Sequence, residues 1–444
     1  MSGLGLKEAW AGGLRRLIRS PGAARIGLGA LRERSLQQLL AAQLTSISGD
    51  FIVIAALPFA VFSIGGSSAQ VSLAFGTGAL LEVALVLFGG VIGDRFPRRA
   101  VMVGADVLRF SSQVTLAILL IFGIAEFWQL LVIQVLQGAG AAFFNPAMNG
   151  LVPEVVPERR LHDANALLTT AFAAGTMLGP ALAGLLIAVG GAGWAFALDA
   201  ATFAASAALL ASIRMAPGSK PEPSGSVIGD LLEGWSEFRL RTWLWVIVAE
   251  FALLNGLVFG PFQVLGASVA GESLGGPGSW AVILTAVGVG QLGGGLIALL
   301  WLPQRPLFTA TLLIVSWAAP LTLLAIAAPL PAIALAAAVA GATMSVFGAI
   351  WHTTLQSKVP ENQRSRMSSY DWLGSLALLP LGYLLAGASQ ALIGADATLI
   401  AAACIVLAAT AIVVPLPAIR GMRSGERPRA LILATATSGS GPTR

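Results

Sequence analysis

The amino-acid sequence predicts an all-α polytopic membrane protein, with twelve transmembrane helices arranged in two pseudo-symmetric six-helix bundles. Three observations lead to this fold class: an apolar composition, a regular succession of long apolar runs, and a one-sided distribution of Lys and Arg between the runs. Of the 444 residues, 56% are hydrophobic and only 11% are charged, and the mean hydropathy is +0.83. Because so few polar groups cannot cover a soluble globule of this size, the chain needs an apolar solvent.

The apolar runs have the length that a membrane span requires, since a bilayer core of about 30 Å is crossed by roughly 20 helical residues. Six runs precede a polar stretch, and they cover residues 37–63, 70–93, 100–122, 127–149, 165–189 and 194–214. Six more follow it, at residues 243–267, 280–301, 307–328, 331–352, 367–388 and 392–414. The chain therefore divides into two sets of six helices joined by a polar linker.

This division predicts five segments. They are a basic N-terminal tail, an N-terminal bundle, a cytosolic linker with an amphipathic helix, a C-terminal bundle and a C-terminal tail, at residues 1–35, 36–215, 216–242, 243–415 and 416–444. The first tail lacks a long apolar core, so it does not have the pattern of a cleavable signal peptide. Both an amphipathic helix on the anionic inner leaflet and a disordered tail are compatible with its composition.

The loops alternate in charge along the chain. Loops on one side carry the basic residues, namely Arg95, Arg98, Arg99, Arg159, Arg160, Lys220, Arg239, Arg241, Arg305, Lys358, Arg364 and Arg366. Loops on the other side carry only Glu126, Glu272 and Asp396. The positive-inside rule then places both termini in the cytosol, and we expect a bacterial cytoplasmic membrane. Basic residues confined to short inter-helix segments do not form a nucleic-acid footprint.

A short repeat supports a duplicated unit. The tripeptide Val-Pro-Glu occurs at residues 156–158 after the fourth span and again at residues 359–361 after the tenth. Two parallel halves related by an axis along the membrane normal are typical of transporters, in which the binding site lies between the halves.

Few residue types that catalyse reactions or hold metals are present. The chain has one cysteine, Cys404, and two histidines, His162 and His352, so we expect no disulfide, no metal site and no cofactor. No loop combines a nucleophile with a base, and no phosphate-binding Gly-rich loop carries a Lys. An enzyme and an ATP-driven pump are therefore disfavoured.

The turn between the second and third spans, residues 90–99, resembles the signature Gly-x-x-x-Asp-Arg-x-Gly-Arg-Arg of the major facilitator superfamily, with Pro97 in place of the usual Gly. The resemblance implies a latch on the cytosolic side, made by charged residues that we assign to gating: Asp94, Arg95, Arg98 and Arg99. The alternative is an anchor that fixes the topology by snorkelling to the membrane interface.

The fifth span is similar to the antiporter signature of exporters, Gly-x-x-x-Gly-Pro-x-x-Gly-Gly. The matching residues are Gly175, Gly179, Pro180 and Gly184, with Ala183 replacing the first Gly of the closing pair. Small residues four apart let helices approach closely, and proline bends the span. Other segments resemble the branch of enterobactin exporters and macrolide efflux pumps, although Gln134 stands where that branch often has an Arg.

Carboxyl groups inside a bilayer are costly, which makes each of them a functional candidate. Asp50 and Glu82 lie about 12 to 13 residues into their spans, or roughly 20 Å at 1.5 Å per residue, and so near the midplane. We predict that they couple transport to protons; the alternative is a protonated or hydrogen-bonded acid that only joins helices. Asp106 and Arg109, three residues apart, are expected to form a local ion pair and to join the gate.

Three further acids are weaker candidates. Asp199 and Glu250 lie within roughly 8 to 11 Å of a span end, so we expect water to reach them. Asp371 lies closer still to the cytosol and is expected to pair with a base of an inner loop.

The resemblance implies a substrate cavity between the halves, lined by the first, fourth, seventh and tenth spans. These spans offer Phe51, Phe143, Phe144, Phe251, Asn255, Phe259, Gln263 and Trp351. Aromatic walls with few polar groups suit a bulky amphipathic molecule, although any one of these rings could instead face lipid or pack the bundle.

Together these features predict a secondary active transporter that exports amphipathic small molecules, such as a drug, antibiotic or siderophore, by proton-coupled alternating access. A lipid flippase or a solute importer on the same fold is the alternative. The expected partners are the substrate, protons and the lipid bilayer, without nucleic acid, and a monomer is expected.

Overall fold

The structure is a computed structural model that describes residues 33–157, 160–213, 235–301 and 303–423. Within these ranges, twelve helical spans are long and apolar enough to cross a membrane. This confirms the predicted fold class. Most of the two tails and most of the linker, including Lys220, lie outside the described residues, as does Arg159 between the fourth and fifth spans.

The N-terminal bundle uses one continuous helix for each span. Its helices are α3 (Arg34–Ser63), α4 (Ser68–Arg95), α5 (Arg98–Ile121), α6 (Phe127–Val155), α7 (Leu161–Gly190) and α8 (Ala192–Ser212). Within the bundle, α4 packs on α6, α5 packs on α8, and α3 packs on both α7 and α8. The turn between α3 and α4 is closed by a capping box, in which the Ser67 hydroxyl accepts from the Gln70 N–H and the Gln70 amide accepts from the Ser67 N–H.

The C-terminal bundle interrupts three of its six spans. The seventh span consists of α10 (Thr242–Leu254), η2 (Asn255–Phe259) and α11 (Gly260–Ser273); the ninth of α13 (Pro306–Ile314), η3 (Val315–Trp317) and α14 (Ala318–Ala325); and the eleventh of α16 (Glu361–Leu376) and α17 (Leu379–Ile393). The continuous spans are α12 (Pro277–Leu300), α15 (Leu330–Lys358) and α18 (Ala395–Val413), which the short α19 (Pro417–Arg420) follows.

The π-helix η2 lies in the middle of the seventh span, where the chain approaches the eleventh span. The Gly260 N–H bonds to the Asn255 carbonyl, five residues back, and a Cβ at Gly256 would lie 2.8 Å from the Leu378 carbonyl oxygen. Pro261, which follows directly, has no N–H to donate to the carbonyl of Leu257. Such π-turns concentrate at functional sites.

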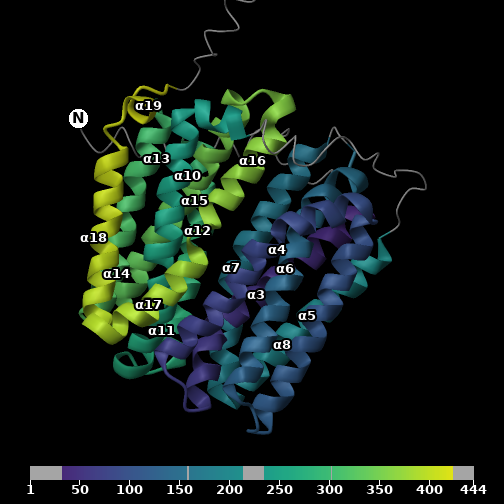
Figure 1. Ribbon diagram of the computed structural model, residues 1–444, viewed down its shortest axis with the longest axis vertical. Helices are drawn as coiled ribbons and strands as arrows, with labels where there is room; N and C mark the ends of the chain where they lie inside the picture. Colours follow the sequence, from purple (N-terminus) through teal and green to yellow (C-terminus); the bar gives the residue numbers. More distant parts are fainter. Residues whose placement is uncertain (1–32, 158–159, 214–234, 302, 424–444) are drawn as a thin grey trace, which may run out of the picture.

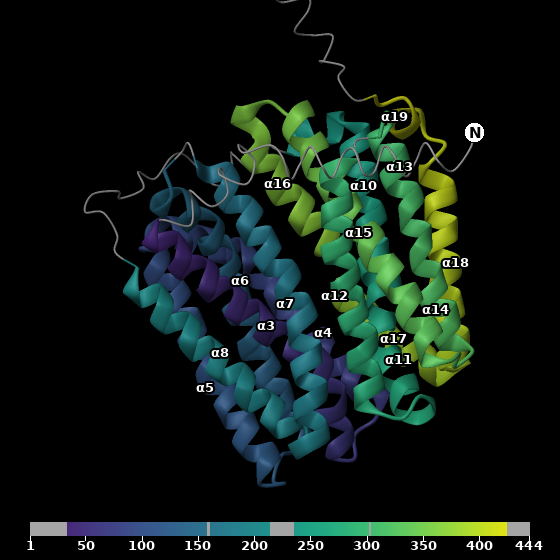
Figure 2. The same ribbon diagram turned by 180° about the vertical axis from the view of Figure 1, so that it is seen from behind.

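The two bundles lie side by side, α3 to α8 in purple to teal and α10 to α19 in green to yellow (Figures 1 and 2). Between them, α7 packs on α12 and α4 packs on α17. The bundles meet at the lower end of Figure 1, where α11 and α17 approach α3 and α4, and they diverge toward the upper end, which carries α16 and α19.

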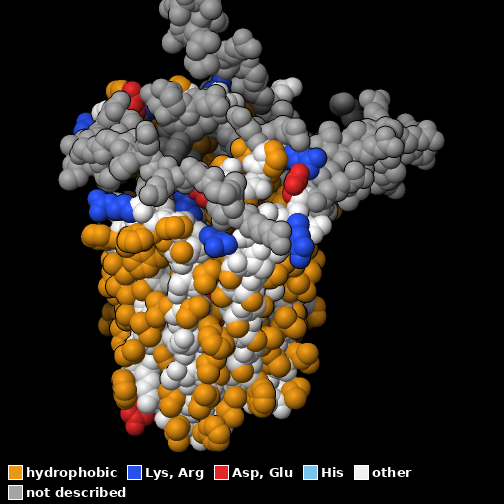
Figure 3. All heavy atoms as spheres, turned by 90° about the vertical axis from the view of Figure 1, so that its right-hand side faces the viewer, with side chains coloured by type: hydrophobic (Ala, Val, Ile, Leu, Met, Phe, Trp, Pro, Cys, Tyr) orange, Lys and Arg blue, Asp and Glu red, His pale blue; other side chains and the backbone are white. Residues whose placement is uncertain are grey.

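The outer surface has the distribution of side chains expected in a bilayer. In Figure 3, hydrophobic side chains cover the wall of the visible face, Lys and Arg gather along its upper edge, and an acidic side chain lies at its lower edge. Large apolar side chains such as Leu185 and Phe88 are more than half exposed on the isolated chain. The upper edge is therefore the basic end, which the positive-inside rule assigns to the cytosol.

Candidate functional site

A polar cluster fills the middle of the N-terminal bundle, centred on Arg109 of α5. Its guanidinium forms an ion pair with Asp50 of α3 and lies 4.0 Å from the ring centroid of Phe203 in α8. Arg109 Nε donates to Gln137 Oε1 of α6 (3.1 Å), and Gln137 Nε2 donates back to the Arg109 carbonyl (3.1 Å) and to Ser112 Oγ (2.9 Å). Four helices thus hold this one base.

The expected local pair between Asp106 and Arg109 is wrong. Arg109 reaches across to Asp50 because Gln137 and Phe203 hold its guanidinium there. Among the described residues, neither carboxylate oxygen of Asp106 has a hydrogen-bond partner of suitable geometry, and the side chain is fully buried.

The expected contact of Asp199 and Glu250 with water is also wrong. Their exposed fractions are 0% and 2%, and both oxygens of each lack a hydrogen-bond partner in the described structure. Depth along a span does not determine which face of the helix a residue occupies, and both acids lie on buried faces.

Glu82 of α4 lies near this cluster without a bond to it. Its Oε1 accepts from Asn145 Nδ2 of α6 at 3.3 Å. The two helices touch here, because a Cβ at Gly138 would lie 2.1 Å from the Gly78 carbonyl oxygen. Glu82 is within electrostatic range of Asp50 and Arg109. The two acids predicted to couple protons therefore share one electrostatic environment.

The gating turn binds to its own bundle. Arg98 Nη1 donates to the Gly150 carbonyl (2.7 Å) and to Glu154 Oε1 (2.9 Å) of α6, and Arg99 Nη1 donates to the Ile213 carbonyl (2.6 Å) just after α8. Arg95 is exposed at the end of α4, and the Asp94 side chain lies outside the described part of the structure. Arg98 and Arg99 tie the ends of α5, α6 and α8 at the basic end of the bundle together.

The antiporter residues of α7 are buried and make two kinds of contact. A Cβ at Gly179 would lie 2.6 Å from the Ser48 carbonyl oxygen, and one at Gly175 would lie 3.2 Å from the Ser48 N, so α7 lies directly on α3 beside Asp50. Pro180, also buried, follows this contact.

The last glycine of the motif faces the other bundle. A Cβ at Gly184 would lie 2.4 Å from the Ala281 Cβ of α12. Further along the same helix pair, Thr176 Oγ1 donates to Gln291 Oε1 at 2.9 Å. The helix α7 therefore connects the environment of the Asp50 ion pair to the interface between the bundles.

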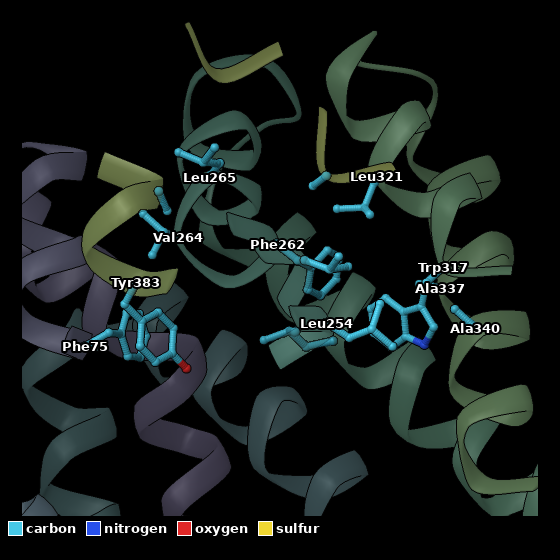
Figure 4. Close-up of a cluster of buried hydrophobic side chains, with 14 of the residues drawn as sticks. Phe75, Leu254, Phe262, Val264, Leu265, Trp317, Leu321, Ala337, Ala340 and Tyr383 are labelled. Atoms are coloured by element: carbon cyan, nitrogen blue, oxygen red, sulfur yellow. The ribbon is translucent and has the colours of Figure 1, made fainter. Parts of the chain in front are cut away.

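Other contacts between the bundles include a group that we term the outer closure: Ser68 and Phe75 of α4 with Ser268 of α11 and Tyr383 of α17. The hydroxyls of Ser68 and Ser268 are 2.9 Å apart. The rings of Phe75 and Tyr383 stack with centroids 5.1 Å apart, as Figure 4 shows. These residues lie in the halves of their spans away from the basic end, so the bundles are joined at the opposite end, which the positive-inside rule assigns to the outer side.

Tyr383 also contacts a residue predicted for the cavity. Its hydroxyl donates to Gln263 Oε1 of α11 at 2.5 Å, and the ring lies within electrostatic range of Glu82. Tyr383 thus links the outer closure to the seventh span and to the α4 acid.

The cavity residues predicted in the C-terminal bundle gather around aromatic pairs. Phe251 and Trp351 both lie against Phe347, with ring centroids 4.6 and 6.5 Å apart, and Phe259 lies 4.6 Å from Trp317. Asn255 Nδ2 donates to the Phe251 and Ser375 carbonyls, both at 3.0 Å, which ties the π-helix to α16.

Asp371 lies beside this aromatic group. Its Oδ2 accepts from Trp351 Nε1 at 2.9 Å. The indole of the tenth span therefore binds one oxygen of Asp371. The expected pairing with an inner-loop base stays a prediction, because the side chains of Arg364 and Arg366 lie outside the described part of the structure.

The aromatic residues predicted in the N-terminal bundle do not join this group. Phe144 is buried in a hydrophobic cluster near the cytosolic end of its own bundle, and Phe143 packs against that cluster. Phe51 makes an edge contact with Phe172 of α7, with centroids 6.0 Å apart.

Sequence reasoning missed several members of the polar cluster. Asp106, Arg109 and Gln113 recur at helical spacing on one face of α5, and this periodicity was the available signal for Gln113. The contact between Phe75 and Tyr383 joins residues far apart in the sequence and gave no local signal.

Comparisons with known proteins agree with this architecture. The family model described as Major Facilitator Superfamily matches residues 39–377. The Multidrug efflux pump Tap of Mycolicibacterium fortuitum is 27% identical over 79% of this chain and 87% of its own length. Macrolide efflux protein A of Streptococcus pyogenes is 23% identical over 78% of this chain and 87% of its own length.

One further comparison covers less than half of the chain, and another concerns the fold alone. The Uncharacterized MFS-type transporter YfiS of Bacillus subtilis is 31% identical over 40% of this chain. The match covers 42% of the length of YfiS, which is less than half. The crystal structure of a D-xylose-proton symporter superposes with a TM-score of 0.67 and 14% identity, covering 89% of this chain and 100% of that one. At this identity the likeness concerns the fold.

Proposed function

This chain belongs to the Major Facilitator Superfamily, and from that premise we propose that it is a secondary active transporter that exports amphipathic small molecules by alternating access in exchange for protons. The observation that carries the proposal is the position of Asp50. Its carboxylate is paired with the buried Arg109, and it follows the turn of α3 that packs on Gly179 of α7.

This position gives protonation a mechanical consequence. A proton on Asp50 would weaken its bond to Arg109, and the adjacent residues of α3 are in backbone contact with α7. The same helix meets α12 of the other bundle through Gly184 and Thr176. We infer that a change at Asp50 is transmitted through α7 to the interface that must rearrange in alternating access.

The arrangement of the bundles supports a cytosol-facing state. The inter-bundle contacts at Phe75–Tyr383 and Ser68–Ser268 lie on the outer side, whereas Arg98 and Arg99 bind within their own bundle on the cytosolic side. A transporter in this state takes up substrate from the cytosol, which fits export.

The substrate class follows from the aromatic group of the C-terminal bundle. Phe251, Phe259 and Trp351 provide apolar surface, and Asn255 and Gln263 are the polar groups among the cavity residues of this bundle. Such walls suit a bulky amphipathic molecule. The relatives named for multidrug and macrolide efflux support a drug or an antibiotic over a sugar.

The test begins with a drug-susceptibility panel in an efflux-deficient bacterial host, which supplies a substrate. Purified protein in proteoliposomes is then assayed for uphill transport driven by a pH gradient and for substrate exchange without a gradient. Glu82→Gln keeps the size and hydrogen bonding of the side chain while removing its proton. We expect it to abolish uphill transport and to retain exchange.

Asp50→Asn in the same assay tests whether Asp50 and Glu82 both carry the coupling proton. Loss in both variants indicates a coupled pair, and loss in one indicates a single carrier. Asp396→Asn, in the first turn of α18 at its outer end, is the matched control. Wild-type transport that ignores the pH gradient would overturn the proton-coupled function and favour the lipid flippase or importer.

We also propose a monomer in a bacterial cytoplasmic membrane with both termini in the cytosol. Reporter fusions after Ser67, Glu272 and Asp396 should report the outside, and fusions after Arg99 and Lys358 the inside. A reversed loop in the N-terminal half would contradict this topology.

A further inference from the structure

The polar cluster of the N-terminal bundle contains more acids than bases. Asp50, Asp106 and Asp199 lie around the single base Arg109, and Asp106 and Asp199 are fully buried. Only Asp50 forms an ion pair with it among the described residues. An isolated ionised carboxylate in an apolar interior is far too costly to persist. The cluster can therefore be electrically neutral only if the two other acids carry protons.

The packing of α5 on α8 arranges these groups in three levels. At the first level Ser206 lies beside Asp106, at the second Phe203 lies under Arg109, and at the third Gln113 lies beside Asp199. Because the two helices run antiparallel, the levels succeed one another at intervals of three or four residues. Arg109 is thus one helical turn from an acid on either side.

Asp199 is also brought against the helix that carries Asp50. A Cβ at Gly49, the residue before Asp50, would lie 2.3 Å from Asp199 Oδ1 and 2.2 Å from Thr202 Oγ1. Only glycine leaves room for this approach. Asp50 and Asp199 therefore flank the same guanidinium, one paired with it and the other without a hydrogen-bond partner of suitable geometry.

We propose that Asp199 is a second proton-carrying residue and the alternative ion-pair partner of Arg109. While Arg109 is paired with Asp50, Asp199 holds a proton. When Asp50 takes up a proton from the aqueous phase on one side of the membrane, Arg109 moves over Phe203 to Asp199, which releases its own proton to the aqueous phase on the other side. One O–H bond forms and one breaks, so the charge of the cluster is unchanged. This inference rests on the proposed proton coupling and adds a residue to it.

The charged groups around Asp199 are few. Asp50 acts on it from α3 and Arg109 from α5, whereas Asp106 lies two levels away on α5. From Ala164 to Gly190, α7 carries no charged residue. No group of three His, Cys, Asp or Glu among the described residues is arranged to hold a metal ion.

The test is infrared difference spectroscopy of the full chain in lipid, which detects the carbonyl stretch of neutral carboxylic acids. We expect a band in the wild type that Asp199→Asn removes, which assigns it. The decisive variant is Asp50→Asn, where Arg109 loses its partner and pairs with Asp199. The Asp199 band should then disappear although Asp199 itself is unchanged.

Glu250→Gln is the matched control, because Glu250 is a similarly buried acid without a hydrogen-bond partner, in the other bundle. The Glu250 band should vanish only in Glu250→Gln, and it should therefore persist in Asp50→Asn. An Asp199 band that survives Asp50→Asn, or no band assignable to Asp199, would overturn the inference. Asp50→Ser, checked by gel filtration, replaces Asp50→Asn if the latter does not fold.

This outcome is separate from the proposed function. Transport by the wild type in a pH gradient tests the function, whereas the bands test Asp199. Uphill transport that depends on sodium instead of the pH gradient would overturn both.

Discussion

Phe75 of α4 stacks on Tyr383 of α17 across the two bundles, with ring centroids 5.1 Å apart and planes inclined by 17°. Both side chains are largely buried. An aromatic pair of this kind is worth about 0.5–1.5 kcal/mol beyond its buried area. Because the pair joins the bundles on the outer side, its energy stabilises the state that is closed there.

Phe75→Ala should therefore shift the protein toward the state that is open to the outside. With the lost area included, we expect a change of at least about tenfold in the equilibrium, since 1.4 kcal/mol corresponds to a factor of ten. Tyr383→Phe keeps the ring and removes only the bond to Gln263, which joins two helices of the same bundle, so a much smaller shift than that of Phe75→Ala is expected.

The readout is labelling of Ser72→Cys in a Cys404→Ser background with a membrane-impermeant thiol reagent added outside. Ser72 is buried against Gly387 in the closed state. Phe88→Ala is the matched control, because Phe88 lies on the same helix and is 63% exposed. Equal labelling in Phe75→Ala and Phe88→Ala would show that the stack does not hold the bundles together.

A second prediction concerns the charge imbalance around Arg109. Arg109→Met leaves acids without a base inside the bundle, whereas Asp50→Asn leaves a base that Asp199 or Asp106 can neutralise. Removing one partner of a buried ion pair costs about 3–5 kcal/mol; the Asp50 side chain is 32% exposed, which reduces this. We expect Arg109→Met to lower the melting temperature more than Asp50→Asn does.

The difference should depend on pH in a defined direction. At low pH the stranded Asp50 carboxylate of Arg109→Met becomes neutral, so its deficit relative to the wild type should shrink as the pH falls. Thermal unfolding in detergent, followed by tryptophan fluorescence, measures this. Arg305→Met, at an exposed cytosolic position, is the control. A deficit that grows on acidification would contradict the charge argument.

The sequence predicted the spans well because the thickness of the bilayer sets the length of each apolar run. It did not predict the π-helix, which depends on the Asn255 and Gly260 geometry and on the contact of Gly256 with Leu378. The sequence showed that Asp50 and Arg109 lie inside membrane spans, but it did not show that they form an ion pair with each other. Which acid a base reaches is decided by Gln137 and other residues on neighbouring helices.

A third prediction separates the two contacts of the antiporter residues. Gly179→Ala places a Cβ 2.6 Å from the Ser48 carbonyl oxygen inside one bundle, so we expect overpacking that costs about 1–3 kcal/mol of stability. Gly184→Ala instead presses on Ala281 of the other bundle, so it should raise outside labelling of Ser72→Cys with a smaller change in melting temperature.

Gly104→Ala is the control for both variants. It lies in a helix of the same bundle, and a Cβ there meets nothing within 4 Å. If both glycine variants lower the melting temperature equally and neither changes labelling, then α7 acts only as a packing helix.

The last prediction concerns the cytosolic latch. Arg98 and Arg99 bind α6 and the end of α8, so in this cytosol-facing state the turn after α4 is held to its own bundle. Asp94 is the turn's acid. If it pairs across the bundles when the cytosolic side closes, Asp94→Asn should leave expression and substrate binding intact while slowing transport several-fold. Glu237→Gln, which removes only a local pair with Arg241, is the control. Transport at the wild-type rate in Asp94→Asn would mean that the turn only anchors the topology, because a latch that closes in every cycle cannot lose its charge without changing the rate.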